Sequence, residues 1–191
     1  MKTKKPLIPR LRFPEFKNTG EWEVKRLGDV LYSIPSSLAL NKIELKESGY
    51  IVYGADGIIG YSDNYQHDEE YISIVKDGSG VGRINFCKPR SSILGTLIAL
   101  KSKDENLYNL KWMFYMLNTI DFSCYIKGAN IPHIYFSDFK KQFIPIPTLP
   151  EQQKIADCLS ALDEQIEAQE QKIELLQQHK KGLLQNLFPK V

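Results

Sequence analysis

The chain has 191 residues, of which 42% are hydrophobic and 25% are charged, and its formal net charge is +2 at pH 7. This length and composition suit one ordinary domain with a buried core and one additional long element. No long apolar stretch is present and no apolar segment follows the charged N-terminus, so we expect neither a membrane span nor a signal peptide.

Residues 1–17 are expected to form a basic N-terminal arm. Three prolines favour an extended path, and the basic residues outnumber a single acidic one, Glu15. They are Lys2, Lys4, Lys5, Arg10, Arg12 and Lys17. This charge suits a polyanionic partner, but solvated terminal lysines are also common.

Residues 18–143 are expected to form an α+β body with a mixed sheet. The segment 21–32 indicates a short strand or turn and then one helical turn, and a polar loop follows at 34–49. Its inward-facing residues should be Val24, Leu27, Val30 and Leu31. Short β-branched or aromatic runs predict strands at 50–53, 58–61, 71–75, 83–86 and 93–100. Helical spacing returns at 107–117, and Ser137 is placed to cap a brief helix over 138–142.

A proline-stiffened strap over 144–150 precedes a long coiled-coil helix over 151–188. From 151 to 187 apolar residues recur at alternating steps of four and three, a period of 3.5 that keeps them on one side of a helix. These 37 residues would make a rod about 55 Å long. The apolar positions, here called the seam, are Ile155, Leu159, Leu162, Ile166, Ile173, Leu176, Leu183 and Leu187. Two polar residues, Gln169 and Lys180, occupy the remaining seam positions and can fix register.

One helix cannot cover this seam by itself. Burying each of its large apolar side chains is worth roughly 1.5–3 kcal/mol before entropy costs, so an open seam would be an association site. The length of the repeat favours pairing with a second helix over the alternative, a helix folded back on its own domain.

The loop Lys76-Asp-Gly-Ser-Gly-Val-Gly82 follows an apolar strand and contains the pattern G-x-G-x-G. A nucleotide-binding loop would have to open a helix whose N-terminus meets the phosphates. A β run follows instead, so we interpret the loop as a hairpin turn and expect no cofactor.

No nucleophile–base pair is identifiable from the spacings. The sequence lacks an Asn/Asp-Pro-Pro-Tyr methyltransferase signature, a Walker lysine loop and a nuclease carboxylate cluster. No metal is expected, because no partner at ligand spacing accompanies the histidines His67, His133 and His179. The widely spaced cysteines, which are typical of reduced thiols in the cytoplasm, are Cys87, Cys124 and Cys158.

Candidate DNA contacts are more numerous. Cationic side chains bind phosphates, and a few Arg, Lys, Asn, Gln or Ser side chains read base edges. Each candidate alone could be an ordinary surface residue, but together, on glycine-rich loops, they form a plausible reading surface. The candidates are Lys76, Ser79, Arg83, Lys88, Arg90, Lys127, Asn130, His133 and Tyr135.

Four stretches resemble the specificity subunit of type I restriction-modification systems. Two are Leu11-Arg-Phe-Pro-Glu-Phe with Gly20-Glu-Trp-Glu-Val-Lys-Arg-Leu-Gly-Asp, and Tyr53-Gly-Ala-Asp-Gly-Ile-Ile-Gly-Tyr61. The third is Gly128-Ala-Asn-Ile-Pro-His-Ile134 with Ser137-Asp-Phe-Lys, and the fourth and most specific is Ile144-Pro-Ile-Pro-Thr-Leu-Pro-Glu-Gln-Gln-Lys-Ile-Ala156. The resemblance covers essentially the whole chain.

The resemblance implies a non-catalytic subunit whose body reads half of a split target in double-stranded DNA. It also implies that the helix acts as a spacer and docks the methyltransferase subunits, which connect to the restriction subunit. Family members usually carry two target recognition domains and two antiparallel helices, whereas this chain has one of each. We therefore expect a homodimer with antiparallel helices, and a different half as the alternative partner. A rod of this length spans at most roughly 16 base pairs, and half-site centres about 10 base pairs apart are favoured.

Two other classes remain open from the sequence. One is a coiled-coil adaptor with a protein-binding body, and the other is a stand-alone methyltransferase. The missing catalytic motif argues against the second.

Overall fold

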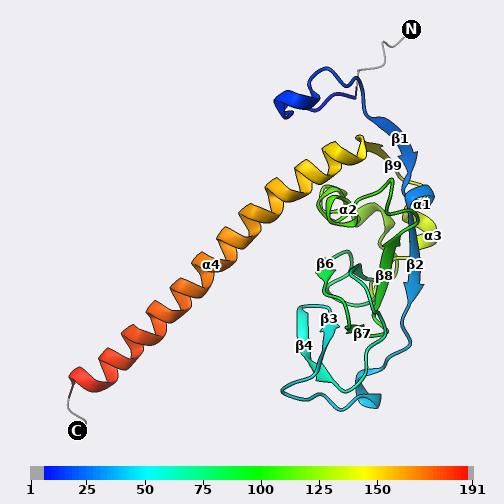
Figure 1. The fold of residues 1–191 in the computed structure, drawn as a ribbon. Coiled ribbons are helices and arrows are strands. Elements are labelled where there is room, and N and C mark those ends of the chain that lie inside the picture. Colours follow the sequence, from blue (N-terminus) through cyan, green and yellow to red (C-terminus); the bar gives the residue numbers. More distant parts are fainter. Residues whose placement is uncertain (1–6, 189–191) are drawn as a thin grey trace. The chain divides into compact units, whose positions relative to one another are not determined.

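The computed structural model describes residues 7–188 and divides into two compact units. The first unit, here called the body, extends to Gln153 and contains the sheets, and the second begins at Lys154. Lys2, Lys4 and Lys5 of the expected basic arm lie outside the described residues. The body followed by one long helix confirms the predicted α+β class with a mixed sheet (Figure 1).

The body contains three sheets. A four-stranded antiparallel sheet has the order β2 (Leu31–Pro35), β8 (Leu97–Ser102), β5 (Tyr71–Val75) and β6 (Ile84–Cys87). A three-stranded sheet places β3 (Tyr50–Gly54) between the antiparallel β4 (Gly57–Ser62) and the parallel β7 (Ser92–Ile93). A separate two-stranded sheet pairs β1 (Glu23–Arg26) with β9 (Phe143–Ile146).

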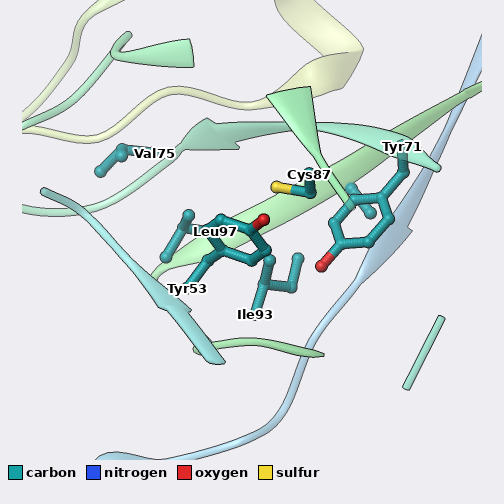
Figure 2. Packing of buried hydrophobic residues seen from close by; sticks show 7 residues of the cluster. Tyr53, Tyr71, Val75, Cys87, Ile93 and Leu97 are labelled. Atoms are coloured by element: carbon teal, nitrogen blue, oxygen red, sulfur yellow. The ribbon is translucent and has the colours of Figure 1, made fainter. Parts of the chain in front are cut away.

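The core lies where the two larger sheets meet. Every residue of β5 is buried, including the polar Ser73, because the strand lies between β8 and β6 in the interior of the sheet. One core cluster draws side chains from β3, β5, β6, β7 and β8 (Figure 2). Its members are Tyr53, Tyr71, Val75, Cys87, Ile93, Leu97 and Ala99.

Short helices close the body. They are α1 (Leu27–Val30), α2 (Leu110–Leu117), α3 (Phe136–Phe139) and the 3-10 turns η1 (Pro14–Phe16), η2 (Leu40–Lys42) and η3 (Ser123–Tyr125). Helix α2 packs against β5 and β6 and buries Trp112, Met113, Met116 and Leu117. Asn109 caps α2, since its side chain accepts a hydrogen bond from the backbone N–H of Trp112 at 2.8 Å.

Two local expectations were wrong. Val24 is 45% exposed, because it belongs to a strand of the small two-stranded sheet, where one face of the strand stays open. The brief helix covers Phe136–Phe139 and not 138–142, and Tyr135 is its N-cap in place of Ser137. The rings of Phe136 and Phe139 stack edge-to-face 5.2 Å apart, so aromatic packing between the first and last residues sets this helix.

The proline-rich segment forms a strand and then a helix start. Residues Phe143–Ile146 are β9, and α4 runs from Leu149 to Leu187, a length of 39 residues or about 58 Å. The helix begins before Glu151 because a proline is tolerated in a first turn, where its missing N–H would have no intrahelical partner.

Candidate nucleic-acid interface

The turn between β5 and β6 carries Lys76, Ser79 and Arg83. The two strands form an antiparallel hairpin, and Val75 and Arg83 are joined by a backbone hydrogen bond of 2.9 Å. Gly78 and Gly82 adopt φ values of +96° and +86°, which glycine accepts without strain. The interpretation as a hairpin turn is confirmed, and no helix N-terminus follows the glycines to meet a phosphate.

A second loop, 127–135, docks directly on this turn. Lys127 and His133 exchange two backbone hydrogen bonds of 2.8 Å, which close the loop between them. Gly78 donates to the carbonyl of Pro132 at 2.9 Å, and Ile134 donates to the carbonyl of Lys76 at 2.9 Å. The fold therefore joins six predicted contact residues on two neighbouring loops, here called the paired loops: Lys76, Ser79, Lys127, Asn130, His133 and Tyr135.

Gly128 is essential to the shape of the second loop. Its φ is +87°, and a Cβ atom there would lie 2.4 Å from the carbonyl oxygen of Ile131. The tight bend places Asn130 and Ile131 in solvent, and Ile131 is 67% exposed. An amide beside an apolar side chain can hydrogen-bond a base edge and contact a thymine methyl group. Ile131 was missed by sequence reasoning, which searched only for polar contacts.

The cations of the paired loops have acidic neighbours. Lys76 pairs with Asp77, and the Nζ of Lys127 lies 2.7 Å from the carboxylate of Asp138. The rings of His133 and Tyr135 stack edge-to-face with centroids 5.1 Å apart. These contacts restrain the side chains before any ligand arrives, and they leave the surface less positive than the sequence indicates.

Arg83 reaches away from the paired loops toward the turn between β3 and β4. Its Nη1 donates to the carbonyl of Ala55 at 3.1 Å and pairs with the carboxylate of Asp56. The arginine thereby links the hairpin to the Tyr53-Gly-Ala-Asp-Gly stretch, and its side chain stays 49% exposed. Arg83 can support this turn and contact a ligand with its remaining donors.

Lys88 and Arg90 lie at the other end of β6. The strand between them and Arg83 has four residues, about 13 Å of extended chain. Both side chains are exposed, and Arg90 is the one non-glycine among residues 7–188 with a positive φ, +52°. The predicted contacts therefore fall into two groups, and only the first lies on the paired loops.

The sequence did not indicate a cavity that lies beside Tyr65. A cavity of about 320 Å³ is lined by residues of the 38–46 loop and by Asn64, Tyr65 and Gln66. The rings of Tyr50 and Tyr65 meet edge-to-face at its border, 4.7 Å apart. The hydrogen bond to Asp68 raises the pKa of Tyr65, and the charge of Arg90 opposes this shift. Exposed tyrosines beside cations would have been the signal in the sequence.

Arg12 is not available to a ligand, contrary to the expectation for the basic arm. Its side chain is 6% exposed, and the guanidinium donates two hydrogen bonds of 2.7 Å to the carboxylate of Glu151, whose side chain is 1% exposed. These hydrogen bonds, and then the charge of Glu151, raise the pKa of Arg12. Arg10 and Lys17 remain exposed. The arm therefore carries a buried structural arginine that its sequence did not distinguish from surface cations.

The described residues offer little for other chemistry. Across 7–188, no group of three or more His, Cys, Asp or Glu side chains could hold a metal ion. Burial raises the pKa of the Cys87 thiol to about 11, so it stays neutral in the core. Cys124 and Cys158 are exposed. Within the same part of the chain, no helix combines the length and apolarity that crossing a bilayer requires.

The sequence and the fold together assign the family. Residues 19–178 match the family described as the type I restriction modification DNA specificity domain, and the chain belongs to this family. The family is one of DNA specificity, and it gives no support to a stand-alone methyltransferase.

Curated relatives agree with this assignment. The chain is 31% identical over 192 residues to the type I restriction enzyme MjaVIII specificity subunit of Methanocaldococcus jannaschii, covering 94% of this chain and 44% of the relative. It is 28% identical over 127 residues to the EcoprrI specificity subunit of Escherichia coli, covering 65% of this chain and 31% of the relative. The chain thus spans less than half the length of these relatives.

Solved structures share the fold. A type I restriction-modification S subunit from M. genitalium matches with a TM-score of 0.77 at 21% identity, over 97% of this chain and 49% of that one. A chain from a structure describing assembly of a type I restriction-modification system matches with a TM-score of 0.59 at 20% identity, over 92% and 45%.

Proposed function

We propose that this chain is a non-catalytic DNA-recognition subunit of a type I restriction-modification complex and reads one half of a bipartite target. Membership of the specificity-domain family supports a recognition function. The observation that carries the proposal is the hydrogen-bonded pairing of the two loops, which gathers two lysines, one amide side chain and two hydroxyl groups on one partly exposed surface.

The paired loops have the chemistry that duplex DNA requires. Lys76 and Lys127 contact phosphates, because a phosphate competes well with the partly exposed carboxylates that hold these lysines in the free chain. Asn130 and Ser79 read base edges, since both are exposed and can donate or accept. His133 and Tyr135 support this surface through their stacked rings. Arg83, Lys88 and Arg90 add phosphate contacts along β6.

The seam of α4 binds a second helix. From Leu162 onward each apolar seam residue is at least 43% exposed, and Leu187 reaches 70%. The charges of the helix also favour an antiparallel partner. Acidic residues dominate the first half after Lys154, at Asp157, Asp163, Glu164, Glu167 and Glu170, and basic residues dominate the second half, at Lys172, Lys180 and Lys181. Antiparallel pairing of two such helices places opposite charges side by side.

The second helix comes from another copy of the chain, and a different half-length partner is the alternative. A two-fold axis between antiparallel helices would relate two identical reading surfaces, so the two half-sites would form an inverted repeat. The paired helices would also dock the methyltransferase subunits and, through them, the restriction subunit.

Mapping of adenine methylation in a host that carries this chain and its methyltransferase subunit tests the proposal. We expect one split motif with two inverted half-sites whose centres lie about 10 base pairs apart. A continuous motif would contradict the bipartite reading, and two unrelated half-sites would favour a different partner half. No change in methylation when the chain is deleted would contradict DNA recognition itself.

A further inference from the structure

The first turn of α4 is bonded to three other parts of the body. Glu151, Gln152 and Gln153 are consecutive, and their side chains contact the N-terminal segment at Arg12, the segment 107–109 and the carbonyl of Pro147. Glu151 and Gln152 are both 1% exposed, although they are polar. Such residues at the start of a helix are normally solvated, so their burial calls for a physical reason.

Arg12 is the partner of Glu151. The guanidinium donates from Nε and Nη2 to the two carboxylate oxygens, a bidentate geometry that fixes both planes. The remaining donors contact the carbonyl of Gly20 at 2.7 Å and the hydroxyl of Thr19 at 2.6 Å. One side chain therefore joins the N-terminal segment, its turn at 19–20 and the first turn of α4.

Gln152 and Gln153 connect the same turn to α2. The Nε2 of Gln152 donates to the carbonyls of Leu107 and Pro147, at 3.0 and 2.9 Å, and its Oε1 accepts from the N–H of Asn109 at 2.8 Å. The side chain of Asn109 donates to Gln153 at 2.6 Å while it caps α2. The start of α4 and the start of α2 thus share one asparagine.

Apolar residues could fix the start of a helix without the desolvation penalty of a buried ion pair. A buried ion pair gains little stability over apolar packing, but its directional hydrogen bonds accept only one arrangement of the bonded segments. We propose that Arg12, Asn109, Glu151 and Gln152, here called the clamp, are positioning residues that restrict which half-site separations the assembled complex accepts. This inference rests on the proposed function.

The geometry of DNA connects the clamp to the separation between half-sites. Each added base pair moves a half-site by about 3.4 Å and rotates it by about 34°. The clamp holds the turn Leu149–Gln153 on the body, and α4 continues from this turn without a break to Leu187. Loss of the clamp hydrogen bonds allows the turn Leu149–Gln153 to move relative to the rest of the body. The complex can then bind half-sites at other separations.

Methylome mapping with clamp variants tests this inference in the assembled complex. Glu151→Gln keeps the side-chain size, Arg12→Lys keeps the positive charge, and each removes the bidentate ion pair. We expect wild type to methylate one spacer length, and each variant to methylate sites with spacers one or two base pairs longer or shorter at more than about a tenth of the level of the preferred spacer. The half-site sequences should stay unchanged, because the paired loops are intact.

Glu69→Gln is the matched control. Glu69 pairs with Lys101 at 2.9 Å but is 72% exposed, so the same change should leave the spacer distribution as in wild type. If a single clamp variant fails to fold, the double variant Arg12→Gln/Glu151→Gln removes the unpaired buried charge. Folded clamp variants that keep a single spacer, or that lose all methylation at an unchanged Tm, would overturn the inference. A wild-type motif that is not split would instead contradict the proposed function.

Discussion

His67 is a buried titratable residue of the body, and its environment makes stability depend on pH. The residue is 7% exposed, and its ring lies 4.2 Å from the ring of Tyr71. Burial, and then the charge of Lys101, lower the pKa of His67 below its ordinary value. The unfolded chain therefore binds the proton first as the pH falls below about 6.5, and the free energy of unfolding decreases there.

Replacement of His67 by phenylalanine should remove this part of the pH dependence. The new ring can keep the packing on Tyr71 but cannot take up a proton. We expect the Tm of wild type to fall more between pH 7.5 and pH 5.5 than the Tm of His67→Phe, as measured by circular dichroism. Equal losses in the two proteins would show that His67 is protonated equally in both states.

The conformation of the loop 127–135 depends on Gly128. Gly128→Ala should destabilise the body by about 1–2 kcal/mol from the positive φ alone, and more from the clash with Ile131. Gly78→Ala separates these effects, because Gly78 has a similar φ of +96° and no atom within 4 Å of the added Cβ. Chemical denaturation should rank wild type above Gly78→Ala and Gly78→Ala above Gly128→Ala. The reverse order of the two variants would contradict the geometry of this loop.

The seam makes a prediction about association. Leu162→Lys with Ile166→Lys places two charges in the proposed helix interface, and we expect the weight-average mass in sedimentation to fall to that of the single chain. Gln171→Lys with Gln178→Lys adds the same charge on the opposite face of α4 and should leave the mass unchanged. Circular dichroism of the body should be the same in both double variants. An intact dimer with lysines at 162 and 166 would remove the assigned interface.

Sequence patterns predicted elements far better than they predicted contacts. The run at 71–75 became β5, because β-branched and aromatic residues favour a buried strand. The run at 93–100 was predicted as one strand, but a turn at Gly95 and Thr96 divides it into β7 and β8, which belong to different sheets. Val24 could not be placed, because which face of a strand is covered depends on its partner, here β9 from the far end of the body. The pairing of Arg12 with Glu151 spans 139 positions, and no local pattern encodes it.

The candidate site was predicted only in part, again because local patterns do not encode contacts between residues that are far apart in the sequence. Lys76 and Lys127 were both selected from composition, yet the hydrogen bonds that bring their loops together join residues more than fifty positions apart. Lys88 and Arg90 were selected by the same criterion and lie at the opposite end of β6. Residue type identifies a candidate contact, and only the fold decides which candidates share a surface.

Substitutions of the proposed DNA contacts should differ in how they change the salt dependence of the affinity for DNA. Removal of one phosphate contact by Lys127→Ala should reduce the slope of log Kobs against log salt by about 1. Asn130→Ala should weaken binding by about 1–3 kcal/mol at every salt concentration and leave the slope unchanged, because the amide displaces no counterion. Fluorescence anisotropy on the methyltransferase complex measures both. Identical slopes in Lys127→Ala and wild type would exclude Lys127 as a phosphate contact.

The division of the chain at Gln153 has a consequence for how target specificity could change by recombination. The residues proposed to contact DNA lie before Gln153, and the seam residues proposed to recruit a partner lie after it. A single genetic crossover in the DNA that encodes α4 would join a different body to an unchanged C-terminal part of the helix. New target preferences could then arise in one event, with no adjustment required of the companion subunits.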